Sequence, residues 1–103
     1  MDGKLVRDQI PQVIRGSGVT PRGYVAGPQE YRWRLRNKLD EEVAEFLAAD
    51  GSSAPGELAD VMEVVHALAA DLGVDPAELE KIRAVKASER CGFAGRVVWM
   101  GNR

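Results

Sequence analysis

Two long stretches of helical apolar spacing, joined by a short polar turn, constrain this 103-residue chain most strongly. Apolar side chains recur every three or four positions in residues 29–49, and the spacing returns in residues 55–72. The predicted apolar face of the second stretch comprises Leu58, Val61, Val65, Leu68 and Leu72. Between the stretches, residues 50–56 read DGSSAPG and favour a turn. Because so short a connection makes consecutive helices antiparallel neighbours, the sequence predicts a helical hairpin.

Further helices are predicted on both sides of this hairpin. Residues 4–16 predict an entry loop followed by a short N-terminal helix, with Asp8 as its cap. Asp75 followed by Pro76 predicts a capped start for a third long helix, which ends near Arg90. The chain is therefore expected to be mostly helical.

Two short segments favour extended structure. Tyr24-Val25 and residues 96–100, RVVWM, are rich in β-branched and aromatic side chains. They predict a minor two-stranded β ribbon at most. We therefore expect one domain, residues 1–103, with an all-α fold: an antiparallel bundle of three long helices and a short N-terminal helix.

Composition narrows the function classes. The chain carries 14 basic and 16 acidic residues, so its net charge of −2 gives no attraction to nucleic acid or to an anionic membrane. No apolar run approaches the roughly 20 residues of a membrane-spanning helix. A single cysteine, Cys91, rules out an intrachain disulfide and fits a cytoplasmic setting. Because a chain this small buries only part of its apolar surface, we expect a homodimer or homotetramer.

Acidic side chains lie beside the predicted core rather than opposite it. At 100° per residue, Glu42 falls roughly 50° from the apolar centre of its helix, and Glu45 falls at the edge of that face. In the next helix Glu57 lies about 60° and Asp60 about 120° from the centre. Both pairs belong to the same end of the predicted hairpin. Four converging carboxylates need a cation, and oxygen ligands suit Mg²⁺ or Mn²⁺.

These acids also have a simpler explanation. Acidic residues in the first turn of a helix interact favourably with its dipole, which accounts for Glu57 and Asp60 without any ligand. Glutamates on the flank of a helix are commonly just solvated. The spacing alone therefore leaves the metal site and the solvated surface as alternatives.

The acidic segments resemble a known enzyme superfamily. KLDEEVAEF followed by ELADVMEVV is similar to the EExxE…ExxD pattern of the MazG-like all-α nucleoside triphosphate pyrophosphohydrolases. KLVRDQIP near the start and ASERCGFAGRVVWM near the end resemble the two ends of a small single-domain group in that superfamily. This group is often described as phosphoribosyl-ATP pyrophosphohydrolase-like. The resemblance covers nearly the whole chain.

The resemblance implies a reaction and a set of residues. Such enzymes hydrolyse a nucleoside triphosphate between the α- and β-phosphorus, with Mg²⁺ as cofactor, and release a nucleoside monophosphate and pyrophosphate. Glu42 and Glu45 match the first metal-binding pair, and Glu57 and Asp60 match the second. Glu41 matches the leading acid of the pattern, which implies a catalytic role for Glu41 beside Glu42.

The resemblance also implies basic residues that contact the substrate phosphates. They are Lys38, Lys81, Lys86, Arg90, Lys4 and Arg7. Each of them has the alternative of being a solvated surface charge, and Lys38 has that of pairing with acids in its own helix. Cys91 departs from the pattern, because the group usually has glycine there. A positive φ at that position would strain a cysteine.

Several functions remain open from the sequence. The first is a Mg²⁺-dependent pyrophosphohydrolase that clears aberrant nucleotides. The second is hydrolysis of phosphoribosyl-ATP in histidine synthesis. The third is a non-catalytic helical module that oligomerises or binds nucleotide. In each reading the partner is a nucleotide or a second copy of the chain, with no membrane and no nucleic acid.

Overall fold

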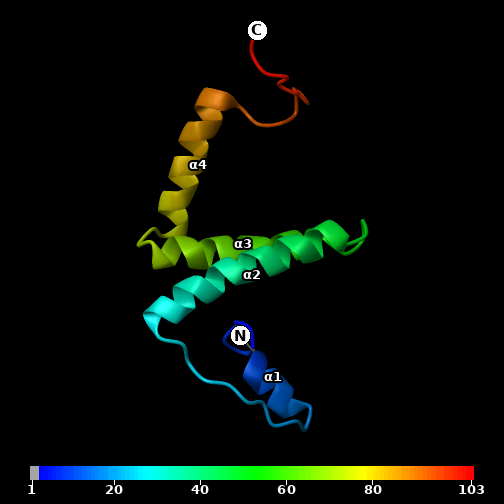
Figure 1. Cartoon of the computed structure of the whole chain (residues 1–103), viewed down its shortest axis with the longest axis vertical. Helices are drawn as coiled ribbons and strands as arrows, with labels where there is room; N and C mark the ends of the chain where they lie inside the picture. The colour runs from blue at the N-terminus through cyan, green and yellow to red at the C-terminus, as the bar shows by residue number, and fades with distance from the viewer. Residues whose placement is uncertain (1–2) are drawn as a thin grey trace.

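The computed structural model describes residues 3–103, which form four helices and no strand (Figure 1). The helices are α1 (Ile10–Gly16), α2 (Pro28–Ala48), α3 (Ala54–Asp71) and α4 (Pro76–Arg90). The all-α prediction is therefore confirmed, with boundaries within one residue for the three long helices. Among the described residues, no helix combines the length and the apolar character needed to cross a membrane.

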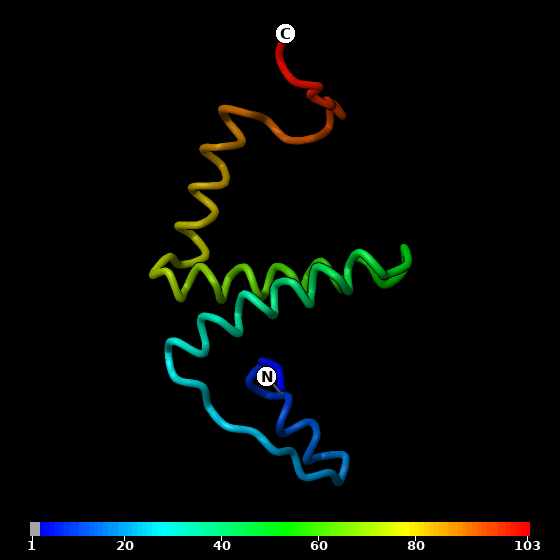
Figure 2. Tube along the Cα trace, in the orientation of Figure 1, coloured from blue at the N-terminus to red at the C-terminus, as the bar shows by residue number. Residues whose placement is uncertain are grey.

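Helices α2 and α3 form the predicted antiparallel hairpin and hold the core. They lie side by side along most of their lengths (Figures 1 and 2). Leu35 of α2 is 2% exposed, and it is buried together with Val64 and Ala69 of α3. At the open end of the hairpin, Arg32 Nε donates to Asp71 Oδ2 at 2.9 Å. This ion pair joins the start of α2 to the end of α3, as an antiparallel arrangement requires.

Local signals account for where the helices begin. Each of the four helices has a proline at its first or second position, where the missing N–H costs little. Asp75 caps α4 as predicted, since its Oδ1 accepts from the Glu78 N–H at 2.8 Å. The predicted cap at Asp8 is wrong. Because α1 begins at Ile10, with Pro11 in its first turn, the capping position falls to Gln9, whose side chain makes no capping bond.

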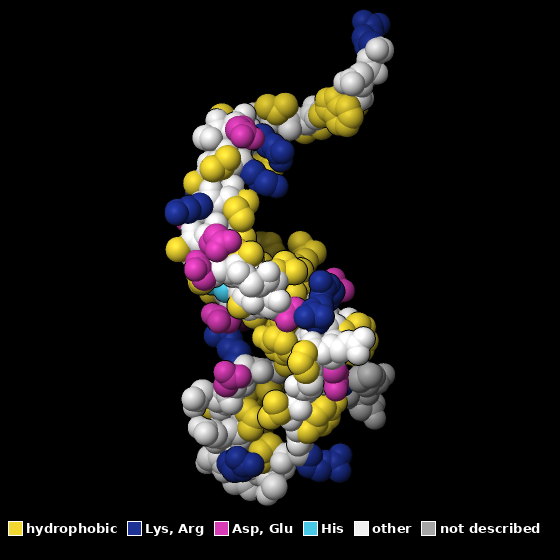
Figure 3. All heavy atoms as spheres, turned by 90° about the vertical axis from the view of Figure 1, so that its left-hand side faces the viewer, with side chains coloured by type: hydrophobic (Ala, Val, Ile, Leu, Met, Phe, Trp, Pro, Cys, Tyr) yellow, Lys and Arg dark blue, Asp and Glu magenta, His cyan; other side chains and the backbone are white. Residues whose placement is uncertain are grey.

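Helix α4 does not join a three-helix bundle, which corrects that part of the prediction. It leaves the end of α3 after Gly73, which has φ +81°, and rises away from the α2–α3 pair (Figure 1). No residue of Pro76–Arg90 is buried, and Ile82 and Val85 are exposed along its side. The radius of gyration is 17.7 Å, against about 13 Å for a compact chain of about 100 residues. Figure 3 shows α4 as a separate column with basic and apolar side chains on its surface.

The predicted β ribbon is also wrong. Tyr24-Val25 lies in the loop before α2, whereas residues 96–100 lie at the opposite end of the molecule (Figure 2). Tyr24 instead donates its hydroxyl to Glu30 of α2. Strand-favouring residues form a ladder only where a second strand lies alongside, and the projection of α4 separates these two segments.

Part of the predicted apolar face of α3 remains uncovered. Val61 and Leu68 are half-buried, but Leu58, Val65 and Leu72 are exposed. Helix α2 packs instead against the flank of α3 that carries Val64. The same flank carries the acidic residues of α3, so this packing brings them against α2.

Candidate functional site

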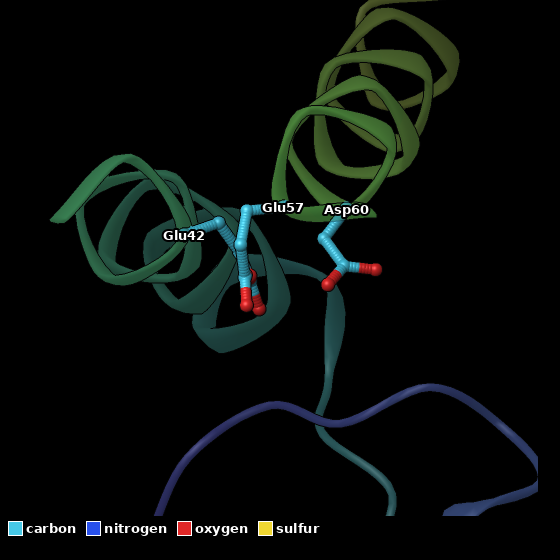
Figure 4. A group of neighbouring side chains, drawn as sticks. All are labelled: Glu42, Glu57 and Asp60. Carbon is cyan, nitrogen blue, oxygen red and sulfur yellow. The ribbon is translucent and has the colours of Figure 1, made fainter. Parts of the chain in front are cut away.

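Three carboxylates converge where α2 ends and α3 begins. Glu42 of α2 and Glu57 and Asp60 of α3 each offer an oxygen, and these oxygens lie within 4.8 Å of one another. Figure 4 shows the carboxylates of Glu42 and Glu57 side by side, with Asp60 facing the same space. A set of carboxylate oxygens at this separation fits a hard divalent cation such as Mg²⁺.

A tight turn sets this convergence. The Oδ1 atom of Asp50 accepts from the N–H groups of Ser52 at 3.0 Å and Ser53 at 3.1 Å, and from the Ser52 hydroxyl at 2.7 Å. These hydrogen bonds, the Ser52 hydroxyl first, lower the pKa of Asp50. An aspartate that binds the backbone two and three residues ahead is typical of such turns. The turn therefore holds the last turns of α2 against the first turns of α3.

Two carboxylate oxygens in this group are buried without a donor. Glu42 is 8% exposed, and its Oε1 lies 3.2 Å from the Lys38 ammonium. Its Oε2 has no hydrogen-bond partner among residues 3–103, and neither has Oε2 of Glu57. Leaving a buried carboxylate oxygen unpaired costs free energy. The two orphaned oxygens therefore favour a bound cation over a merely solvated acidic surface.

Glu45 lies at the border of the three-carboxylate group. It is exposed, and its side chain contacts that of Glu42. The hydrogen bond with Glu42 and the negative charge of Glu42 raise the pKa of Glu45. A cation between the two carboxylates would relieve this repulsion, so Glu45 stays a candidate ligand beside Glu42, Glu57 and Asp60.

Lys38 and Glu41 form an ion-paired flank on the α2 side. The Lys38 ammonium lies 3.2 Å from Glu41 Oε2 as well as from Glu42. Burial lowers the pKa of Lys38, but its hydrogen bonds to Glu41 and Glu42 outweigh this effect and raise it. For Glu41, burial raises the pKa, but Lys4 and Lys38 together lower it. Lys38 thus remains protonated, and this one ammonium group forms ion pairs with two carboxylates.

The residues before α1 cross the site as a strap, which we define as residues 3–9. Lys4 Nζ lies 3.0 Å from Glu41 Oε1, and Arg7 Nη2 lies 2.7 Å from Asp60 Oδ1. The sequence predicts both basic residues as phosphate contacts. In the structure each of them pairs with an acidic residue of the site.

Arg34 anchors the strap, and sequence reasoning missed it. Its Nη1 donates to the Gly3 carbonyl at 3.0 Å, and its Nε lies 2.9 Å from Glu30 Oε2. It also donates to the Tyr24 hydroxyl at 3.3 Å. Its guanidinium lies 5.6 Å from the ring centroid of Trp33. The spacing of Glu30 and Arg34, four residues apart on one helix, was the available signal.

A pocket of about 520 Å³ lies between the strap and the hairpin. Its walls combine charged side chains at the acidic end with apolar and aromatic ones, and they include Lys4, Leu5, Arg7, Ile10, Tyr31, Leu35, Lys38, Glu42, Asp60 and Val64. Pockets that bind small ligands are usually about 300–1,000 Å³ in volume and mix these two kinds of surface.

Three of the predicted phosphate contacts do not reach this pocket within one chain. Lys81, Lys86 and Arg90 lie on α4, which starts from the end of α3 remote from the turn at Asp50 (Figure 1). None of the three lines the pocket formed by residues 3–103. Their role in binding phosphate stays a prediction.

Comparisons with known proteins add one partial likeness. The chain matches no protein-family model, and no solved structure matches it. It is 55% identical over 47 residues to a protein of Mycolicibacterium smegmatis described as uncharacterized. The match covers 46% of this chain and 48% of that protein, so the aligned part spans about half the length of the relative.

Proposed function

We propose that this protein is a Mg²⁺-dependent nucleoside triphosphate pyrophosphohydrolase. The observation that carries the proposal is the convergence of Glu42, Glu57 and Asp60, with two buried oxygens that lack a donor. The resemblance of KLDEEVAEF and ELADVMEVV to the MazG-like pattern supports the same residues. The overall reaction adds one water and yields a nucleoside monophosphate and pyrophosphate.

The residues of the site divide into three tasks under this proposal. Glu42, Glu57 and Asp60 hold Mg²⁺, with Glu45 beside them. When bound, the cation supplies positive charge for the polyphosphate and makes a water molecule more acidic. Lys38 lies within the site and adds positive charge for the remaining phosphate oxygens. The low pKa of Glu41 weakens it as a proton acceptor until phosphate draws Lys4 and Lys38 away from it.

A second copy of the chain is part of the proposal. Exposed apolar side chains follow one side of α3 at intervals of four and three residues, Leu58, Met62 and Val65, and Leu72 continues the stripe two helical turns later, just past the end of the helix. Such a stripe is typical of a helix that packs against another helix. We infer a homodimer or homotetramer that covers this stripe. Size-exclusion chromatography with light scattering tests this, and a strict monomer at micromolar concentration would contradict it.

The decisive experiment measures pyrophosphate. Purified protein is incubated with each of the common ribo- and deoxyribonucleoside triphosphates and with Mg²⁺, and the released pyrophosphate and nucleoside monophosphate are quantified. The proposed reaction should release the two products in equal amounts. Parallel samples contain a chelator in place of Mg²⁺. A folded protein that binds Mg²⁺ but releases no pyrophosphate from any nucleotide would overturn the proposed activity.

The substrate separates two physiological roles. Clearance of aberrant nucleotides in the cytoplasm is the role that we favour, and hydrolysis of phosphoribosyl-ATP in histidine synthesis is the alternative. Growth of a deletion strain without histidine distinguishes them. If turnover is absent but the oligomer forms, the exposed stripe on α3 favours the second candidate function, a helical interaction module.

A further inference from the structure

The strap places a cation of the protein itself on one of the three converging carboxylates. Arg7 Nη2 lies 2.7 Å from Asp60 Oδ1, and 43% of the Asp60 side chain is accessible, against 10% of that of Glu42. By contrast, Glu42 and Glu57 each hold a buried oxygen without a donor. The guanidinium of Arg7 therefore neutralises only the outer edge of the acidic group.

We propose that Arg7 is an exchangeable counter-cation: it pairs with Asp60 in the metal-free protein and transfers to the substrate polyphosphate when a divalent cation takes Asp60. This inference rests on the proposed function, because it requires the metal site and a phosphate ligand. It goes beyond a phosphate contact, since it makes metal binding and nucleotide binding depend on the same side chain.

The Arg7–Asp60 pair is suited to exchange. The Arg7 side chain is 57% exposed, and ion pairs at such positions are weak. A divalent cation held by three carboxylates competes well for Asp60. The released guanidinium can bind two phosphate oxygens at once, which an ammonium cannot do.

The start of the strap is held by a buried side chain, unlike Arg7. Arg34, which is 8% exposed, donates to the Gly3 carbonyl, and Lys4 pairs with Glu41 one residue later. The far end of the strap continues into α1. Arg7 thus projects from a segment that is anchored at its start. Its side chain can turn from Asp60 into the adjoining pocket of about 520 Å³ without release of the strap.

Isothermal titration of the full chain with MgCl₂, without nucleotide, tests the first half of the inference. Removal of the competing charge in Arg7→Gln should tighten Mg²⁺ binding by about two- to fivefold, as expected for loss of one exposed pair. The matched control is Arg15→Gln, which removes the same charge from the last turn of α1. It should leave the affinity unchanged.

Titration with a non-hydrolysable triphosphate analogue at saturating Mg²⁺ tests the second half. Arg7→Gln should weaken analogue binding by about tenfold, as for loss of a charge-assisted phosphate contact. Arg15→Gln should not weaken it. Arg7→Lys keeps the charge but loses the planar fork, so it should bind Mg²⁺ like the wild type and bind the analogue less well. Circular dichroism verifies that each variant is folded.

The outcomes separate this inference from the proposed function. If the wild type binds Mg²⁺ and Arg7→Gln binds it equally or more weakly, the exchange is overturned while the metal site stands. If Arg7→Gln tightens Mg²⁺ binding but leaves analogue binding intact, transfer to phosphate is overturned. Failure of all the variants and the wild type to bind Mg²⁺ would overturn both the exchange and the proposed function.

Discussion

The α2–α3 pair and the segment from α4 to the C-terminus differ in what holds them. Every residue that is buried among residues 3–103 belongs to α2 or α3, including the charged Arg34 and Glu42. Helix α4 has a better N-terminal cap than either of them, yet no residue of it is buried. Local signals are therefore sufficient for a helix, whereas a site requires packing between helices.

The largest expected effect contrasts an acidic residue of the pair with one of α4. Glu42→Ala should lower the rate of pyrophosphate release by more than about 100-fold. Mutation of residues that only support a metal ligand already lowers metal affinity or activity by about 10–100-fold, and Glu42 is itself a proposed ligand. Helicity should persist, because alanine favours the helix and the substitution removes a buried charge. Glu89→Ala on α4 is the matched control and should keep full activity. Equal activity of the two variants would refute the site assignment.

The next effect contrasts apolar residues. Leu35→Ala should lower the free energy of unfolding by about 2–5 kcal/mol, because Leu35 is 2% exposed and its truncation leaves a cavity. Ile82→Ala, at a position 46% exposed, should cost about 1 kcal/mol or less. Urea denaturation followed by circular dichroism measures both. A cost for Ile82→Ala as large as that for Leu35→Ala would mean that α4 is covered in solution.

A smaller effect is expected at the end of α4. Cys91 has φ +61° and ψ −156°, a conformation that glycine adopts readily and other residues adopt at a cost of about 1–3 kcal/mol. Cys91→Gly should therefore raise the free energy of unfolding, by about 1 kcal/mol after the greater backbone entropy of glycine is offset. Thermal and urea denaturation test this. A variant less stable than the wild type would show that Cys91 makes a contact worth more than the strain.

The smallest expected effect is a dependence of the stability of the α2–α3 pair on pH. Since Glu42 raises the pKa of Glu45 above its ordinary value of 4.5, the folded protein binds this proton more tightly than the unfolded chain. Stability of the metal-free protein should then increase as the pH falls from neutral through the raised pKa. Glu45→Gln should show a flatter melting temperature against pH over that range. Identical slopes would argue against contact between the two carboxylates.

Helical periodicity predicted the buried part of the site well. The position of Glu42 close to the apolar centre of its helix anticipated its burial, and the short turn anticipated the approach of Glu57. Asp60 was placed about 120° from the apolar centre, which suggests an exposed residue. It nevertheless joins the group, because α2 packs on the Val64 flank of α3 instead of on its most apolar stripe.

Contacts between residues far apart in the sequence could not be predicted from helical periodicity. Nothing in the spacing of residues 3–9 indicates that Arg7 pairs with Asp60, 53 residues later, or that Arg34 binds the Gly3 carbonyl. The direction of α4 and the separation of the two strand-favouring segments likewise depend on the path of the chain. Periodicity fixes the face of a helix, but it does not specify the neighbour that covers that face.

The turn at Asp50 also has a consequence for the order of folding. It joins Glu42 to Glu57 across a loop of 14 residues, whereas the strap must close a loop several times longer before Arg7 meets Asp60. Short loops close sooner and at a lower entropic cost. We therefore expect the carboxylates to assemble first, while they lack their basic partners from the strap. A divalent cation present at that moment should accelerate hairpin formation, so refolding should be faster in Mg²⁺ than in a chelator.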